Sequence, residues 1–215
     1  MDLANNINAI KNNSKNIEIQ YFGDFCYYFN LLKHTHIYFN DALAHQKGLF
    51  LNRMRIYGPN KIILLTIPLE GGRSVKGIVK DLKIANREPW QRTHWRSIHD
   101  SYRKAPWFDE YAPGLSELYG QSYNFLWDWN LATIQWALDS LKCNQVIMSV
   151  SDLETTTLLP SNNTKIQKAS SINYPVYNQV FSDRFGFIPN LSIVDLIMNE
   201  GPEASKYLLS IEVKD

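Results

Sequence analysis

The residues best suited to chemistry lie in one stretch, Glu88 to Tyr111, which holds three of the six tryptophans and two of the five histidines. Pro89 suits the first turn of a helix, where its missing N–H is not needed, and Pro106 ends the helix because the residue before a proline avoids the helical region. We therefore predict a helix over residues 89–104. One of its faces is cationic, with basic side chains at helical spacing: Arg92, Arg96, His99 and Arg103.

This cationic face has two interpretations. It is a site for a phosphate or carboxylate, since guanidinium groups beside tryptophan suit anions, or it is a solvated face on a helix whose other side is packed. Spacing alone favours the solvated face. His94 is the stronger functional candidate, because a histidine at the edge of an apolar stripe must either hydrogen-bond inside the fold or face a cleft. The stripe comprises Gln91, Trp95, Ile98 and Tyr102.

The elements that must position these residues alternate between strands and helices. Strands are expected at residues 17–22, 36–40, 47–57, 61–69, 77–84 and 144–150, with 47–57 and 61–69 joined as a hairpin by the turn at 58–60. Helices are expected over 25–33, over 89–104, over 115–142 as one helix or two in line, and from a cap at Asn190 to Gly201. Residues 151–172 are expected to be an exposed connection or a lid.

This order predicts the fold class. Repeated strand-to-helix order with one antiparallel pair indicates an α/β (α+β) fold, a single domain over residues 17–215 in which a small mixed sheet is packed with several helices. A polar leader over residues 1–16 precedes it.

Composition limits the classes of partner. With 22 basic and 21 acidic residues, the chain has no global field to attract nucleic acid or an anionic membrane. No run approaches the roughly 18 apolar residues of a membrane helix, and the asparagine-rich start lacks the apolar region of a secretory signal, so we expect no membrane span and a cytoplasmic location. Cys26 and Cys143 lack metal-ligand spacing to a histidine. No metal and no cofactor is expected.

Seven blocks of the chain, in their order and spacing, resemble the WbqC-like protein family. They are YFGDFCYYFNLL (21–32), NRMRI (52–56), LLTIPLEGGR (64–73), VKDLKI (79–84), the stretch at 88–111, FLWDWNL (125–131) and VFSDRFGFIPNLSIVDLIMNEGP (180–202). The resemblance implies proteins of bacterial surface-polysaccharide gene clusters, O-antigen clusters among them, with a suggested role in acylating or aminoacylating an amino sugar. The forms YFG and DRFGFIPNLSI are similar to those of Bacteroidetes members.

The resemblance also implies which polar and aromatic residues matter. Matched position by position, the family's recurring residues fall on Tyr21, Lys47, Asn52, Arg53, Trp90, His94, Trp95, Tyr102, Pro106, Asn190, Ser192 and Asp195. The chain departs from the family pattern at Leu51, which replaces the first arginine of an RNR motif and removes one candidate anion ligand. It also departs at His45, where an aromatic residue or asparagine is common, and in a shorter 151–172 connection.

The first functional hypothesis is an acyl- or aminoacyl-transferase acting on a nucleotide-activated amino sugar, with an activated acyl or aminoacyl donor as its second substrate. This chemistry needs a base for the ammonium group, hydrogen-bond donors for the oxyanion and cations for the diphosphate. His94 is the expected base, oriented by Asp195, and Asn52 is an expected donor together with the N–H groups near Ser192. Further binding roles are assigned to Arg53 and Arg96 for phosphate and to Tyr21, Lys47, Trp90, Tyr102 and Asn190. A covalent route through Cys26 is less favoured, because that residue has the surroundings of a core cysteine.

The second hypothesis is a non-catalytic protein of cell-envelope assembly that binds a glycan or nucleotide sugar. Under either hypothesis we expect one cleft, where the 21–24 turn, Asn52-Arg53, His94 and the helix start at 190–195 converge. Burial and nearby arginines should lower the pKa of His94 below about 6.5, and Asp195 should oppose that shift.

Overall fold

The structure is a computed structural model that describes residues 14–45, 50–72, 75–149 and 172–213. Strands β1 (Ser14–Ile17), β2 (His36–Phe39) and β5 (Val146–Ser149) form a parallel sheet in the order β1-β2-β5. Strands β3 (Arg53–Gly58) and β4 (Lys61–Thr66) form an antiparallel hairpin in which Gly58 pairs with Lys61. Strands β6 (Ile172–Asn173) and β7 (Glu212–Val213) form a second antiparallel pair.

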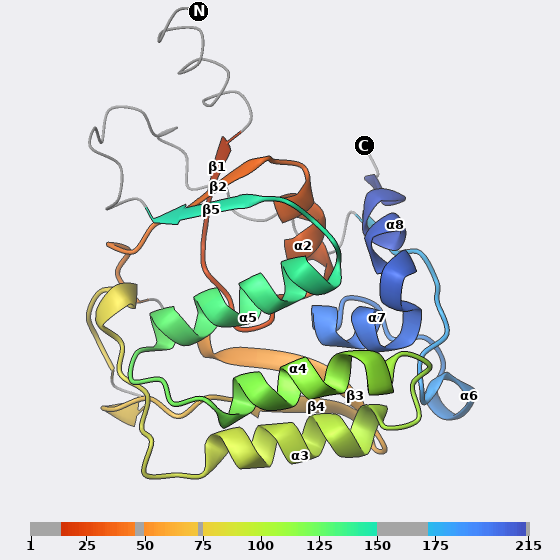
Figure 1. The fold of residues 1–215 in the computed structure, drawn as a ribbon, viewed down its shortest axis with the longest axis horizontal. Coiled ribbons are helices and arrows are strands. Elements are labelled where there is room, and N and C mark those ends of the chain that lie inside the picture. The colour runs from red at the N-terminus through yellow and green to blue at the C-terminus, as the bar shows by residue number, and fades with distance from the viewer. Residues whose placement is uncertain (1–13, 46–49, 73–74, 150–171, 214–215) are drawn as a thin grey trace, which may run out of the picture.

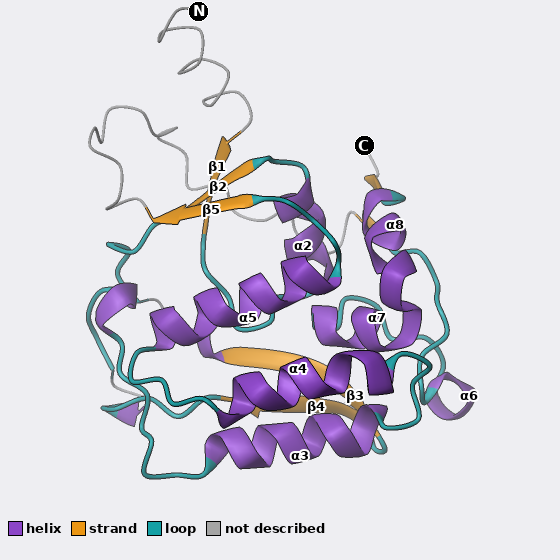
Figure 2. Cartoon of the chain, in the orientation of Figure 1, coloured by secondary structure: helices purple, strands orange, loops and turns teal. Residues whose placement is uncertain are grey.

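The described part of the chain also contains α-helices. They are α2 (Phe25–Leu32), α3 (Trp90–Tyr102), α4 (Phe108–Gly120), α5 (Leu126–Ser140), α6 (Ser182–Phe185), α7 (Ile193–Glu200) and α8 (Ala204–Leu209). Three short 3-10 turns lie at Phe50–Asn52, Val79–Asp81 and Gly201–Glu203. Figure 1 shows α5 between the β1-β2-β5 sheet and a layer formed by α3, α4 and the β3–β4 hairpin. Figure 2 shows that helices cover the hairpin on this side, while α7 and α8 lie beside the end of α5.

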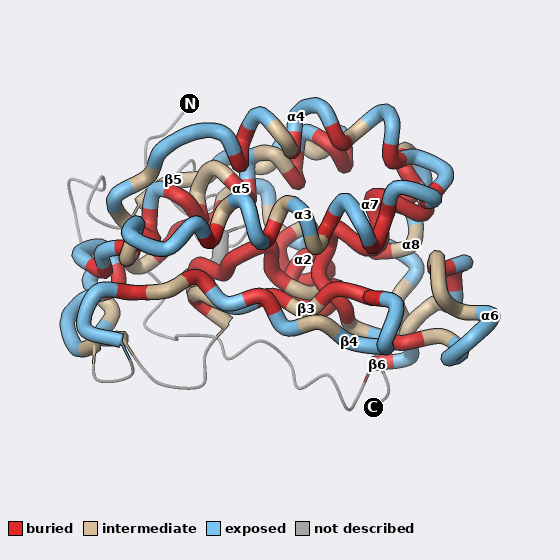
Figure 3. The backbone as a smooth tube through the Cα atoms, turned by 90° about the horizontal axis from the view of Figure 1, so that it is seen from below, coloured by how far each residue is buried: buried red, intermediate tan, exposed pale blue. Residues whose placement is uncertain are grey.

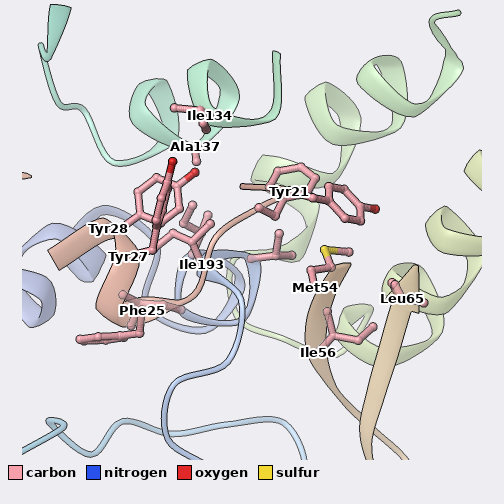
Figure 4. Packing of buried hydrophobic residues seen from close by; sticks show 14 of the residues in the cluster. Tyr21, Phe25, Tyr27, Tyr28, Met54, Ile56, Leu65, Ile134, Ala137 and Ile193 are labelled. Atoms are coloured by element: carbon pink, nitrogen blue, oxygen red, sulfur yellow. The ribbon is translucent and has the colours of Figure 1, made fainter. Parts of the chain in front are cut away.

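The core between these layers is rich in aromatic rings. Trp129, Tyr21 and Tyr102 are among its largest fully buried side chains. Figure 4 shows part of it, with Phe25, Tyr27 and Tyr28 on one side of the view and Met54, Ile56 and Leu65 of the hairpin on the other. Burial alternates along α3, α4 and α5, which turn buried stripes towards the core, whereas α2 and α7 are buried along almost their whole length (Figure 3). Removing this apolar surface from water is the main force that holds the helices in place.

The predicted fold class is confirmed: the chain forms a single α/β domain with parallel and antiparallel strands, which are distributed over three small sheets. The hairpin and the helix after Pro89 are also confirmed, although α3 ends at Tyr102. The 115–142 region was expected to be one helix or two in line, and this is wrong: it contains the end of α4 and all of α5, which are joined by a loop at 121–125 and pack against each other (Figure 1). In α3 and α4 the helical axes run side by side (Figure 1).

Two predicted strands are wrong. The chain at 17–22 is not a strand, because β1 ends at Ile17 and residues 21–22 make a turn. The segment at 77–84 is a 3-10 turn flanked by single bridges, in which Ile78 pairs with Ala44 and Ile84 pairs with Leu69. The bridges of this segment go to different parts of the chain, at Ala44, Leu69 and Phe125, so no continuous ladder forms.

The helix near the end of the chain begins later than predicted. Ser192, not Asn190, is the N-cap of α7, and its side chain accepts a hydrogen bond from the N–H of Val194. The helix ends at Gly201, whose φ of +54° favours glycine. A Cβ atom there would lie 2.3 Å from the ring of Trp107, so this position has no room for a side chain.

Some predicted features fall on residues that the structure does not describe. Residues 1–13 of the predicted leader and 151–171 of the predicted connection lie outside the described residues, as does Lys47. Residues 14–16, also assigned to the leader, belong to β1.

Candidate functional site

His94 lies in the second turn of α3 and is buried, with 4% of its surface exposed. Its Nδ1 atom is 2.9 Å from the hydroxyl oxygen of Tyr21, and that hydroxyl is hydrogen-bonded to the hydroxyl of Tyr119. The imidazole ring stacks on the ring of Tyr21 and lies edge-on to the ring of Trp90, with the two ring centroids 5.3 Å apart. His94 therefore hydrogen-bonds inside the fold, which is the first of the two alternatives for this residue.

The contacts of His94 indicate its protonation state. Burial lowers the pKa of His94 to about 4, and a bond from the ring to the backbone of Thr66 opposes the shift. If one ring nitrogen donates to Thr66, Nδ1 is the acceptor, so Tyr21 donates to Nδ1 and Tyr119 donates to Tyr21. The predicted lowering of the His94 pKa is confirmed: of the two predicted causes, burial accounts for it and the arginines do not contribute.

Asp195 is fully buried in a separate polar cluster. Its carboxylate accepts hydrogen bonds from the hydroxyls of Tyr102 and Tyr177, at 2.8 and 2.7 Å, and from Nε2 of Gln179 at 2.9 Å. Burial raises the pKa of Asp195 to about 6, while these three bonds act in the opposite direction. The expected pairing of Asp195 with His94 is not what the described residues show, because each has its own set of partners.

The expected oxyanion donors, Asn52 and the N–H groups near Ser192, are engaged within the fold: the N–H of Ser192 donates to the carbonyl of Arg55 and that of Ile193 to the carbonyl of Gly23. Nδ2 of Asn52 donates to the carbonyl of Ile67 at 2.8 Å, where the loop after β4 returns past it. The hydroxyl of Ser192 donates to the carbonyl of Phe22 at 2.9 Å while it caps α7. Both side chains therefore bind backbone that positions the neighbouring elements.

Three of the four segments expected to form a cleft do meet. The N–H of Ile193 donates to the carbonyl of Gly23, and the N–H of Ser192 donates to the carbonyl of Arg55. Asn190 accepts from the N–H of Cys26, donates to Asp24, and receives a hydrogen bond from Arg55 at its carbonyl. His94 reaches this junction only through Tyr21, the residue before Phe22.

The junction leaves little open space. The hollow at its surface has a volume of about 10 Å³, room for about one water molecule, and Arg53 lies at its rim. Arg55, which sequence reasoning left out, is 3.5 Å from the Asp24 carboxylate. Burial raises the pKa of Asp24, although its bonds to Tyr27, Arg55 and Asn190 oppose this. This arrangement holds the starts of α2 and α7 together and does not enclose a ligand.

A larger opening lies between the first half of α3 and the end of α4. It is a groove of about 500 Å³, lined by Asn86, Glu88, Pro89, Trp90, Gln91, Arg92, Trp95, Ser116, Tyr119, Gly120 and Ser122. Trp95 is half-buried and its ring lies 6.3 Å from that of Tyr119. We call this the α3–α4 groove.

The α3–α4 groove combines aromatic surface with polar groups. Aromatic rings pack against the apolar faces of sugars and bases, and amides, hydroxyls and charges give such sites their orientation and specificity. Nε2 of Gln91 donates to the carbonyl of Gln121, so its amide is held at the rim. Because Trp90 and Tyr119 both line the groove and both contact the His94 network, the groove wall and the buried network are continuous.

The structure therefore separates the sequence-predicted residues into groups. Trp90 lines the groove, His94 and Tyr21 lie behind it, and Tyr102 and Asp195 form a different buried cluster. Arg96 is exposed and 3.7 Å from Asp100, and it is not among the residues that line the groove. Sequence reasoning missed Tyr119, whose position in a helical apolar pattern gave only a core signal.

No described helix has the length and apolar character needed to cross a membrane. Among the described residues, no group of three or more histidine, cysteine, aspartate or glutamate side chains is placed to hold a metal ion.

The structure is that of a single α/β domain whose α3–α4 groove is lined in part by aromatic residues. Comparison with known families places the chain in the WbqC-like protein family, whose model matches residues 21–173 and 158–207. The chain belongs to that family, which is loosely linked to polysaccharide biosynthesis. No curated protein and no solved structure matches the chain.

Proposed function

We propose that this WbqC-like protein binds an amino sugar of surface-polysaccharide biosynthesis in the α3–α4 groove. The observation that carries this proposal is the composition of the groove wall, in which the half-buried ring of Trp95 stands beside the mostly buried rings of Trp90 and Tyr119 and beside amide and hydroxyl groups. Rings of this kind stack on the apolar face of a pyranose, and the polar groups can bind its hydroxyls. The family's link to polysaccharide biosynthesis supports the same ligand class.

A blocking substitution tests the groove directly. Gly120 ends α4 at the groove, and a Cβ atom added there meets nothing within 4 Å, so Gly120→Leu places a side chain in open space without displacing a neighbour. We expect the wild-type protein to bind an amino sugar, free or nucleotide-activated, by titration calorimetry, and Gly120→Leu to weaken binding at least about tenfold.

The matched control is Asn124→Leu, an exposed position between α4 and α5 that is not among the groove residues. This variant should bind as the wild type does. The proposal is wrong if no amino sugar binds the wild type, or if the two leucine variants bind equally well.

Acyl or aminoacyl transfer to that sugar is the second candidate function. The observation that favours it is the uncharged His94, whose Nδ1 accepts through a hydrogen-bonded chain that ends at Tyr119 in the groove wall. A neutral imidazole can take a proton through such a chain, although a pKa of about 4 makes it a weak base. The occupied donors of Asn52 and Ser192 give this candidate less support than binding has.

Mass spectrometry of the sugar product separates the two candidates. A transferase should attach the acyl group when supplied with a nucleotide-activated amino sugar and an activated acyl or aminoacyl donor, and His94→Gln should lose most of that activity. If His94→Gln binds the sugar normally and restores polysaccharide synthesis in a deletion strain, transfer through His94 is excluded.

A further inference from the structure

The β3–β4 hairpin has one edge that the fold uses and one that it leaves open. In the hairpin, the N–H of Ile67 donates to the carbonyl of Asn52, and bonded pairs alternate with unbonded pairs along antiparallel strands. Every second residue of β4 therefore turns its backbone groups towards β3. The N–H and carbonyl groups of Ile62 and Leu64, which lie between those residues, point away from the hairpin.

The two outer edges of the hairpin differ in their contacts. On the edge formed by β3, the carbonyl of Arg55 accepts a hydrogen bond from the N–H of Ser192. On the same edge, the N–H of Tyr57 donates to the hydroxyl of Tyr102. On the edge formed by β4, the two outward-pointing residues have no backbone hydrogen-bond partner in the described part of the chain. An open edge of this kind is a template for a further strand.

The side chains along this open edge are apolar and exposed. Ile62 is 44% exposed and Leu64 is 51% exposed, on the face of the hairpin opposite the buried Leu65. The apolar surface continues past Tyr57, the ladder partner of Ile62, to Phe185, which is 38% exposed and whose ring lies 6.4 Å from that of Tyr57. Edge strands are usually protected by a charge, a proline or a bulge, and β4 has none of these between its first and last residues.

We propose that β4 pairs with β4 of a second copy of the chain, antiparallel and about a two-fold axis at Ile63, to form a four-stranded sheet. In this register Ile62 of one copy lies opposite Leu64 of the other, and their outward N–H and carbonyl groups bond to each other. The strand is its own complement, because its free donors, its free acceptors and its exposed apolar side chains are symmetric about Ile63. A register that used Thr66 would compete with the bond from His94 to its backbone.

The size of this contact sets the expected affinity. Pairing through one six-residue strand makes a small interface, in the class of transient complexes that bury less than about 1,200 Å². We therefore expect a dimer that dissociates in the micromolar range. The inference is independent of the proposed sugar-binding function, since it uses no residue of the α3–α4 groove.

Sedimentation equilibrium of the full chain, over a range of micromolar concentrations, tests the proposal. The wild type should show a monomer–dimer equilibrium. Leu64→Lys removes apolar contact and brings two like charges close to the axis, so it should raise the dissociation constant at least about tenfold. Leu209→Lys is the matched control, because that leucine is 66% exposed on α8, and it should dimerise as the wild type does. Both exposed substitutions should keep the circular dichroism spectrum and melting temperature of the wild type.

A disulfide tests the register. Ile63 should lie opposite its own copy in an unbonded pair, where the Cα atoms are about 4.5 Å apart, within the span of a disulfide. In a Cys143→Ser background, Ile63→Cys should give a covalent dimer on oxidation, and Leu209→Cys should not.

Three outcomes would overturn the proposal: a wild type that is monomeric at every concentration, equal dimerisation of Leu64→Lys and Leu209→Lys, or failure of Ile63→Cys to cross-link. A monomeric wild type that binds anionic lipid vesicles, with binding lost in Leu64→Lys, would identify the open edge as a membrane-contact surface instead. Sugar binding in the α3–α4 groove is measured separately, so its failure and the failure of this inference are distinguishable.

Discussion

At the scale of single residues, burial decides which polar side chains can take part in chemistry. His94 and Asp195 have the residue types of a base and its orienting acid, but they are 4% and 0% exposed and have complete sets of partners inside the fold. Arg92 lies in the groove, and within the described ranges of the chain no ion pair engages it. Residue type alone thus pointed to the buried groups, whereas accessibility points to the groove through the exposed Arg92 and the half-buried Trp95, since Trp90 and Tyr119 are themselves only 5% exposed.

The first prediction concerns the charge of His94. Because burial lowers its pKa to about 4, the imidazole should remain neutral until the solution is more acidic than for a free histidine, which titrates at about 6.5. NMR titration of the ring resonances should give a midpoint near 4. A midpoint at or above 6.5 would mean that the ring is solvated or paired with an anion.

The second prediction concerns the thiol of Cys26. Its place in the first turn of α2 would favour a thiolate, but burial, together with the Asp24 charge, raises its pKa to about 12. In a Cys143→Ser variant, the remaining thiol should react with a disulfide reagent at pH 8 more than about a hundredfold more slowly in the native protein than in urea. Equal rates would show that Cys26 is accessible and would return the covalent route to consideration.

At the scale of elements, α3 and α4 are held as the two walls of the groove by contacts at both ends. The N–H of Trp107, between the helices, donates to the carbonyl of Met198, and the ring of Trp107 rests against Gly201 at the end of α7. The turn between α3 and α4 is therefore fixed by the helix that also contains Asp195. A substitution at Gly201 should therefore disturb the position of Trp107 and of the turn between α3 and α4.

The third prediction is that Gly201→Ala destabilises the protein by about 2 kcal/mol or more. The substitution combines an unfavourable positive φ with a Cβ atom 2.3 Å from the Trp107 ring. Urea unfolding measures the effect. Gly120→Ala is the matched control, because that glycine lacks a positive φ and has open space around its Cβ position, so its stability should be unchanged or slightly higher.

Elements with local signals were predictable from the sequence, and those defined by distant contacts were not. Pro89 marks the start of α3 and the 58–60 turn fixes the hairpin register. The 77–84 segment has strand-like residues, yet its pairing partners, Ala44 and Leu69, lie in different parts of the chain. A single sequence does not show that apolar residues share no common partner strand.

The residues of the candidate site also separate into those with a local sequence signal and those defined by distant contacts. The Trp90 and His94 neighbourhood followed from helical spacing, whereas the groove requires Tyr119 from a second helix, which the apolar period of α4 marks only as core. The three donors to Asp195 come from α3 and from the segment before α7, so the carboxylate's structural role becomes visible only after the chain has folded.

At the scale of the whole molecule, two buried titratable groups act on stability in opposite directions. The pKa of Asp195 is raised from 3.8 to about 6 in the folded state, so its contribution to stability falls as the pH rises across that window. The pKa of His94 is lowered from 6.5 to about 4, so its contribution is lost as the pH falls from 6.5 to 4. Each shift corresponds to about 3 kcal/mol, and the two largely offset each other. Asp24 and Glu18, whose pKa values burial also raises, act in the direction of Asp195.

The fourth prediction separates these two contributions. Asp195→Asn should leave the His94 effect opposed by Asp24 and Glu18 alone, so the free energy of unfolding should drop by up to about 3 kcal/mol between pH 6.5 and pH 4. His94→Gln should show the reverse slope, with stability increasing as the solution becomes more acidic. Urea unfolding at several pH values checks both variants against a wild-type curve that is flatter than either, and parallel curves for all three proteins would contradict the assignment.

The junction at Gly23 and Ile193 also determines when the protein can fold during its synthesis. Bonds such as that from Ser192 to Phe22 join positions 170 residues apart, and the same contact region fixes the starts of both α2 and α7. Contacts so distant in sequence are slow to form, because a long loop must close before they contribute. The first turn of α2 therefore cannot form its bonds to the 190–193 segment until that segment has left the ribosome. The early part of the chain should remain incompletely packed for most of translation.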